Sequence, residues 1–411
     1  MLAGGPLARA AEAGAQTVPE PTAAPADSAP GLRVELITLG PGPLVWERFG
    51  HNALRVVDPA SGLDVAYNWG MFSFDEPGFL GRLLKGTMMY WMAPFDSEGM
   101  LAAYRGADRS IWIQELALTD AQKVELRDIL ATNALPQNAY YRYDYYRDNC
   151  STRVRDALDR VTGGRVRAVL QGAPTGTSYR WHTRRLLQDM PSMYTGIQLV
   201  LSGRADREID RWEEAFLPVK LMEAVREVRV LDDAGVERPL VASEREDYRS
   251  LAVSEPAAPP RAWPWFLGLG LALAAVLAAL ASVGAGWSRA LTALLGGAWG
   301  AAAGIAGVVL IGAWLFTDHV FWYPNWNLLQ TNPLGLALAA LLVPLLARGR
   351  PSSAATVLAM AIGALSLLGL LVHLVTAQRN GDILALTVPL NLGVAGALLR
   401  ARRSGEPLAG S

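Results

Sequence analysis

Cys150 is the only cysteine among the 411 residues, so it is the one side chain that could act as a thiol nucleophile. It lies in the segment 147–153 (RDNCSTR), at the start of a predicted amphipathic helix. The helix is predicted by apolar residues at helical spacing and a glycine pair that ends it: Val154, Ala157, Leu158 and Val161, then Gly163 and Gly164. In a first turn, unpaired N–H groups and the positive end of the helix dipole stabilise a thiolate. Three polar residues could cap that turn: Asp148, Asn149 and Ser151.

A thiol becomes an effective nucleophile when a base lies within hydrogen-bond reach and a third group orients that base. His51 begins a predicted strand, which turns at 58–62 into a return strand ending at Trp69. Pairing the two strands places His51 opposite Asn68 or Trp69, within a residue or two. Cys150, His51 and Asn68 could therefore supply nucleophile, base and orienting group. The same residues also fit a non-catalytic reading, with a buried structural cysteine and a satisfied strand histidine.

The rest of the first 261 residues mixes strands and helices, which indicates an α+β fold. Strands are predicted at 33–39 and 110–118, helices at 96–104, 120–133 and 179–187, and a hairpin at 228–242. A further helix, 210–226, contains Pro218, which should kink or split it. His182 could be a second base or a headgroup contact, but a structural or surface role is the favoured interpretation.

The composition changes near Pro260. From Ala262 onward the chain has seven arginines, no lysine and three acidic residues. Its apolar residues form five runs: 263–283, 290–316, 332–347, 354–376 and 383–399. Most approach the roughly 20 residues that a bilayer crossing needs, so we expect about five transmembrane helices. The third run is short and contains Pro344, so we expect it to be tilted, kinked or to begin earlier.

The arginines predict the orientation of these helices. Six of the seven lie at one set of helix ends: Arg289, Arg348, Arg350, Arg400, Arg402 and Arg403. The positive-inside rule places that side and the C-terminus in the cytoplasm and the first 261 residues outside it. The connection 318–331 is then expected to be an aqueous loop on the outer side.

The predicted organisation has four parts. They are a disordered N-terminal segment (1–31), an extracytoplasmic catalytic domain (32–253), a linker (254–262) and a transmembrane helical domain (263–403). The segment 13–15 (AGA) looks like a signal cleavage site, but Arg9 and Glu12 interrupt the apolar stretch before it. Either the native start lies upstream of Met1 or the first membrane helix directs the topology, and we favour the first interpretation.

Charge and spacing exclude other partners. With 37 basic and 38 acidic residues the chain lacks the basic surface that nucleic-acid binding usually needs. Four scattered histidines and one cysteine give no metal-ligand spacing, and no phosphate-binding glycine motif is present, so no cofactor is expected.

Three motifs around the candidate residues resemble a known family. They are WERFGHN at 46–52, YNWG at 67–70 and YDYYRDNCSTR at 143–153. They look like the N-terminal periplasmic domain of the Lnb-type bacterial lipoprotein N-acyltransferases, over about residues 33–251. The order of histidine, polar residue and cysteine is similar to circularly permuted papain-like enzymes of the NlpC and lecithin:retinol acyltransferase type. The resemblance therefore implies a permuted papain-like fold for the extracytoplasmic domain.

The resemblance also implies a function. Cys150 would be the nucleophile and His51 the general base, and the permuted papain-like pattern adds Asn68 as the orienting group. An acyl chain would pass from a membrane phospholipid through a Cys150 thioester to the N-terminal amine of a lipoprotein. The protein would lie in the bacterial inner membrane, with its N-terminal domain in the periplasm.

Two alternatives of other classes remain. A membrane-tethered cysteine peptidase or amidase acting on cell-wall peptides would use the same dyad, and a polar groove beside Cys150 would favour it. A non-enzymatic membrane scaffold would instead leave Cys150 and His51 far apart.

Overall fold

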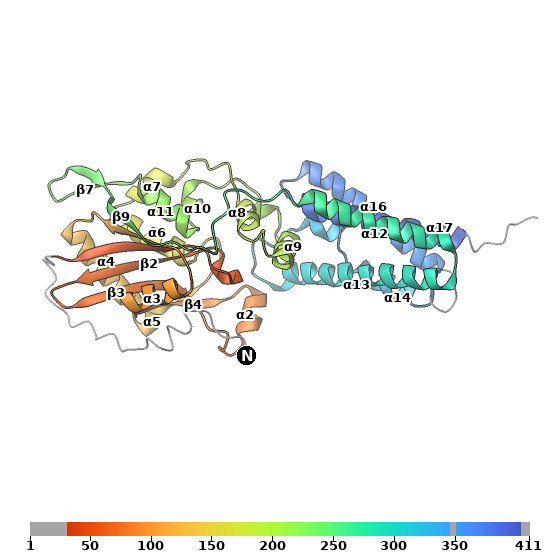
Figure 1. Cartoon of the computed structure of the whole chain (residues 1–411), viewed down its shortest axis with the longest axis horizontal. Coiled ribbons are helices and arrows are strands. Elements are labelled where there is room, and N and C mark those ends of the chain that lie inside the picture. The colour runs from red at the N-terminus through yellow and green to blue at the C-terminus, as the bar shows by residue number, and fades with distance from the viewer. Residues whose placement is uncertain (1–30, 346–350, 404–411) are drawn as a thin grey trace, which may run out of the picture. The chain divides into compact units, whose positions relative to one another are not determined.

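The computed structural model describes residues 31–345 and 351–403, so the predicted disordered segment 1–31 lies almost entirely outside it. Contacts divide the chain into two compact units. One runs to His182 and resumes at Glu208–Ala257, and the other joins Thr183–Arg207 to the chain from Ala258 onward. The first unit is a sheet flanked by helices and the second is helical (Figure 1). An α+β first unit agrees with the sequence.

The first unit is built on a seven-stranded antiparallel sheet of order β6-β4-β3-β2-β1-β5-β9. Its strands are β1 (Arg33–Leu39), β2 (His51–Asp58), β3 (Leu63–Met71), β4 (Met89–Asp96), β5 (Ile111–Leu116), β6 (Tyr140–Arg142) and β9 (Val241–Tyr248). Central β2 is buried along almost its whole length. Leu54 and Val56 enter one core and Ala53 another, because alternate side chains point to opposite faces.

Helices lie on both faces of this sheet. The helices of the first unit are α2 (Phe79–Lys85), α3 (Ser97–Gly106), α4 (Asp120–Ala134), α5 (Pro136–Ala139), α6 (Cys150–Val161), α7 (Arg165–Leu170), α10 (Arg211–Glu214) and α11 (Pro218–Val225), with a short 3-10 turn, η1 (Val45–Glu47). Helix α8 (Tyr179–Leu186) begins in the first unit and ends in the second. Val154 and Leu158 of α6 are fully buried in the core that holds Leu54. Tyr104 of α3 lies in the other core.

The predicted helix 210–226 is two helices, because Pro218 begins α11 at a position that needs no intrahelical N–H donor. The predicted hairpin forms between β7 (Arg229–Leu231) and β8 (Glu237–Pro239). Strand β9 was not predicted: its sequence VASEREDY lacks apolar alternation, since it is a largely exposed strand at the edge of the sheet.

The second unit contains α9 (Pro191–Val200), α12 (Trp263–Val283), α13 (Gly286–Phe316), α14 (Leu334–Leu342), α16 (Ser353–Val375) and α17 (Gly381–Arg403), with 3-10 turns η2 (Gly203–Ala205) and η3 (Trp326–Leu329). Among the described residues, four helices are long and apolar enough to cross a membrane: α12, α13, α16 and α17. Gly304 on α13 permits close packing on α14, since a Cβ there would lie 2.5 Å from the backbone nitrogen of Leu336.

Two membrane-domain expectations need correction. The third apolar run forms the nine-residue α14 rather than a full span, and Pro344, which cannot donate a helical hydrogen bond, follows it closely. Residues 346–347 of that run lie outside the described chain.

The connection 318–331 is not an exposed aqueous loop. Asn325 and Asn327 are buried, and their side-chain amides donate to the carbonyl of Leu199 on α9 at 2.9 and 2.7 Å. Also in this unit, Asp382 of α17 accepts hydrogen bonds from Arg184 at 3.0 Å and from Tyr194 of α9 at 2.6 Å. The segment around α9 is therefore held by residues far along the chain.

Candidate functional site

Cys150 is the first residue of α6, and Asn149 caps that helix. The Asn149 Oδ1 atom accepts the backbone N–H groups of Ser151 and Thr152, both at 3.0 Å. The first N–H groups of a helix have no intrahelical partner. The cap occupies two of them and leaves the N–H of Cys150, next to the sulfur, outside its reach.

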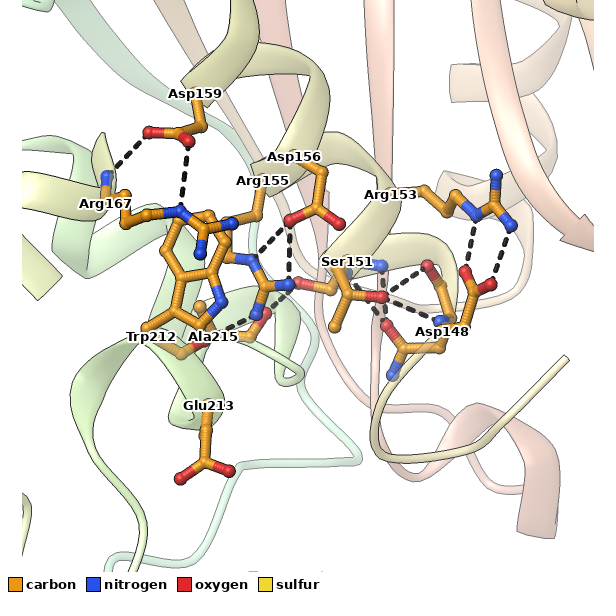
Figure 2. Close-up of polar contacts among 12 residues, drawn as sticks. Asp148, Ser151, Arg153, Arg155, Asp156, Asp159, Arg167, Trp212, Glu213 and Ala215 are labelled. Atoms are coloured by element: carbon orange, nitrogen blue, oxygen red, sulfur yellow. Dashed lines mark hydrogen bonds and ion pairs between the residues drawn. The ribbon is translucent and has the colours of Figure 1, made fainter. Parts of the chain in front are cut away.

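Side chains on either side of Cys150 fix the start of α6. Ser151 Oγ donates to the carbonyl of Ala215 at 2.7 Å and contacts Asn52 Oδ1 of β2 at 2.9 Å. Figure 2 shows the Ser151 hydroxyl directed toward Ala215, and Arg153 paired with Asp148. Because these contacts join α6 to β2 and to the segment before α11, they set the position of the thiol.

His51 and Asn68 are in direct contact, with His51 Nε2 and Asn68 Oδ1 3.0 Å apart. In the observed register Asn68 pairs with Ala53, two residues from His51. A two-residue offset keeps a side chain on the same face of the sheet, so the predicted contact forms diagonally across the ladder.

The hydrogen bonds of Asn68 determine which nitrogen of His51 carries the proton. Asn68 Nδ2 donates to the carbonyl of Ala66 at 2.9 Å, so its Oδ1 is the atom that faces the imidazole. Oδ1 can only accept, so Nε2 carries the hydrogen and Nδ1 keeps a lone pair. Burial lowers the pKa of His51 to about 4, and the positive charge of Arg109 acts in the same direction. The imidazole is therefore neutral at neutral pH and can accept a proton at Nδ1.

Cys150 lies against the neighbours of His51 and Asn68. Burial raises the pKa of its thiol, while the backbone N–H groups of Asn52 and Ser151 and the charge of Arg109 oppose that rise. The Cβ of Cys150 is 3.5 Å from the point that a Cβ on Gly70 would occupy. Among the described residues no hydrogen bond joins Cys150 to His51. Catalytic hydrogen bonds are often long without substrate and tighten in the complex.

Three buried residues around this site were not predicted. The Asn52 amide donates to Thr38 Oγ1 at 2.8 Å, which fixes the strand beside the thiol. Arg109 donates to the carbonyl of Gly40 and lies 4.8 Å from the ring centre of Tyr104, which stacks on His51. Asn52 stood in a quoted motif, but nothing in the sequence indicates the long-range placement of Arg109 or Tyr104.

Two family models match the chain. The model described as the Lnb N-terminal periplasmic domain matches residues 26–189, which include Cys150, His51 and Asn68. The model described as the Lnb transmembrane domain matches residues 264–401. The chain belongs to the Lnb family. It is thus a membrane protein with a periplasmic N-terminal domain. No curated protein and no solved structure matches it.

Four apolar residues of the periplasmic Lnb domain, Trp46, Phe74, Leu80 and Leu84, are 44, 53, 65 and 59% exposed. The Trp46 and Phe74 ring centres are 5.4 Å apart, and Phe74 contacts Phe79 at the start of α2, the helix that carries both leucines. We call these four residues the apolar surface patch. Ring contacts lead inward from it. Phe74 contacts Phe72 at 5.1 Å, Phe72 stacks on Tyr90 at 5.0 Å, and Tyr90 stacks on Tyr143 at 4.1 Å. Tyr143 is close enough to Cys150 for a thiolate there to raise its pKa further above the level set by burial. Aromatic residues therefore connect the patch to the surroundings of the thiol.

His182 of the Lnb domain is fully buried, and its Nε2 lies 3.0 Å from both Glu214 Oε1 and Thr177 Oγ1. These contacts join α8 to α10 and support a structural role rather than that of a second base. Within residues 31–345 and 351–403, no cluster of three or more His, Cys, Asp or Glu side chains could hold a metal ion.

Proposed function

We propose that this protein is a thiol acyltransferase of the inner membrane, with a permuted papain-like periplasmic domain, that moves an acyl chain from a phospholipid to the N-terminal amine of a lipoprotein. The observation that carries the proposal is the neutral tautomer of His51, which its contact with Asn68 selects. The next residue on the same strand is Asn52, and its backbone N–H lies against the Cys150 thiol. Base precedes nucleophile along the chain, as the permuted arrangement requires.

The first half-reaction loads the enzyme. His51 Nδ1 takes the thiol proton as Cys150 Sγ attacks the carbonyl carbon of a phospholipid acyl ester. The ester C–O bond then breaks, and the proton passes from the imidazolium to the departing lysophospholipid oxygen. An acyl thioester remains on Cys150.

The second half-reaction unloads it. The α-amine of a lipoprotein's lipidated N-terminal cysteine attacks the thioester carbonyl and gives a proton to His51. The C–S bond breaks, the proton returns to the sulfur, and the acyl chain leaves as an amide. Asn68 supports both halves, because its Oδ1 stabilises the Nε2–H of the imidazolium while Nδ1 exchanges the proton.

The surroundings of Cys150 favour an acyl substrate over a cell-wall peptide. The apolar surface patch and the rings that lead from it toward Tyr143 would accept a hydrocarbon chain and offer few partners for a peptide backbone. A scaffold without catalysis is disfavoured, because Cys150 lies against Asn52, which follows His51, and against Gly70, two residues after Asn68.

Mass spectrometry of lipoprotein N-termini tests the proposal. Cells without another N-acyltransferase would make the wild type, Cys150→Ala or the control Tyr140→Phe, whose ring is 55% exposed. We expect N-acylated termini with the wild type and the control, and free amines with Cys150→Ala. Purified wild type incubated with phospholipid should also gain one acyl mass that hydroxylamine removes. N-acylation that persists in Cys150→Ala, or is absent with the wild type, would refute the acyltransferase.

A further inference from the structure

Gly70 leaves an open point beside the nucleophile. The pairing of β3 with β4 shifts between Trp69 and Met71, and Gly70, at the shift, has a φ of +91° that favours glycine. A Cβ placed on Gly70 would lie 3.5 Å from Cys150 Cβ, 3.8 Å from the Tyr141 hydroxyl and 3.9 Å from the Cys150 nitrogen. No atom outside residues 69–71 comes closer, so these three groups border the space in front of the missing Gly70 side chain.

Two hydrogen-bond donors face this point. One is the backbone N–H of Cys150, which the Asn149 cap does not take. The other is the hydroxyl of Tyr141, a residue that is 7% exposed and whose oxygen has no hydrogen-bond partner among the described residues. Buried hydroxyl groups are nearly always paired, so an unpaired one next to a nucleophile calls for an explanation.

Neighbouring residues fix the position of the Tyr141 ring, although its hydroxyl has no hydrogen-bond partner among the described residues. Tyr141 lies on β6 and pairs with Tyr90 of β4. The guanidinium of Arg153 stands 4.2 Å from its ring centre and is itself paired with Asp148. Burial raises the pKa of Tyr141 well above its usual value, so the hydroxyl keeps its proton at neutral pH.

We propose that the Tyr141 hydroxyl and the Cys150 N–H form an oxyanion hole in the space in front of Gly70. The inference rests on the acyl-transfer function proposed above and assigns a further catalytic residue to it. The Cβ position is one covalent bond from the Gly70 Cα, so a substrate oxygen would lie beyond it, in the space that the two donors border at 3.8 and 3.9 Å from that position.

The role of Tyr141 follows from the charge that develops. When Cys150 Sγ bonds to the acyl carbon, the carbonyl π electrons move onto oxygen, and this oxyanion accepts hydrogen bonds from the two donors. When the leaving group departs, the C=O double bond forms again. Tyr141 keeps its proton throughout, so it stabilises charge without transferring a proton.

The test compares Tyr141→Phe with Tyr140→Phe, its exposed neighbour on the same strand, in full-length protein. The probe is a medium-chain p-nitrophenyl ester, and the burst of p-nitrophenol gives the acylation rate of Cys150. Alkylation of Cys150 by iodoacetamide is measured in parallel, since that reaction forms no oxyanion. Removing one such donor typically lowers kcat about 100-fold to 1,000-fold, so Tyr141→Phe should lower the acylation rate by about 100-fold. The KM and the alkylation rate of Tyr141→Phe at each pH should stay at wild-type values. Tyr140→Phe should match the wild type in acylation rate, KM and alkylation rate.

Equal acylation rates in Tyr141→Phe and the wild type would overturn the inference. A parallel fall in alkylation would also overturn it, because Tyr141 would then act on the thiol. If Tyr141→Phe does not fold, Tyr141→Leu provides the second variant: it is apolar and also lacks the hydroxyl, so acylation should fall while alkylation persists. If the wild type acylates Cys150 but never acylates a lipoprotein amine, the proposed function fails and the oxyanion hole stands. If the wild type shows no burst, both fail.

Discussion

Replacing His51 by Gln should remove a pH-dependent part of the protein's stability. The folded state holds the pKa of His51 at about 4 by burial, against 6.5 for an exposed imidazole. Between these values the unfolded chain binds a proton that the folded chain excludes, so stability falls as pH drops from 6.5 towards 4. From pH 7 to pH 5 the linkage amounts to about 2 kcal/mol. Gln is neutral throughout and carries no such dependence.

The assay is thermal unfolding in detergent, followed by tryptophan fluorescence at pH 7 and pH 5, for the wild type and His51→Gln. A loss of about 2 kcal/mol corresponds to a fall in Tm of roughly 4–8 °C for a domain of this size. Between pH 7 and pH 5 the Tm of the wild type should therefore fall by roughly 4–8 °C more than the Tm of His51→Gln. Other groups titrate equally in both proteins, so the difference isolates His51. Equal pH dependence in the two proteins would refute a buried neutral imidazole.

Three further outcomes follow from the site. Asn68→Ala should lower the acylation rate of Cys150 about fivefold, since it removes the roughly 1 kcal/mol hydrogen bond that selects the reactive tautomer of His51; an unchanged burst rate would contradict this. Asn149→Ala should lower unfolding stability by about 2–4 kcal/mol, because it removes a helix cap and unpairs two carbonyls, and Asn149→Ser, which keeps an N-cap acceptor oxygen, should lose less in the same thermal assay. Leu80→Ser, at a 65% exposed position, should leave Tm unchanged and reduce reaction with long-chain but not short-chain esters; equal losses with both would exclude an acyl-chain contact there.

Local patterns predicted the parts of the site that depend on neighbours in sequence. The helix start at Cys150 and the hairpin that carries His51 and Asn68 each follow from about ten residues of spacing, capping and turn chemistry. Arg109 and Tyr104 were not predictable, because their place beside His51 depends on how α3 packs on the sheet.

Apolar run length was a weaker guide in the membrane domain. Four of the five runs form helices of sufficient length, but the third is interrupted at Pro344. The connection before it reads as a polar loop, yet Asn327 and Gln330 are buried because their amides find partners on other segments. A hydropathy scale counts the free-energy cost of burying a polar side chain, but it does not count the hydrogen bonds that offset this cost in the folded protein.

The segment around α9 also has consequences for biogenesis. Arg184 and Tyr194 share Asp382 as acceptor, and 198 and 188 residues separate them from it in sequence. At 5–20 residues per second, translation takes roughly 10–40 seconds to reach α17 after α9 has been made. During that interval the Asp382 carboxylate is not available to either side chain, so this early segment reaches its final contacts only after α17 has been synthesised.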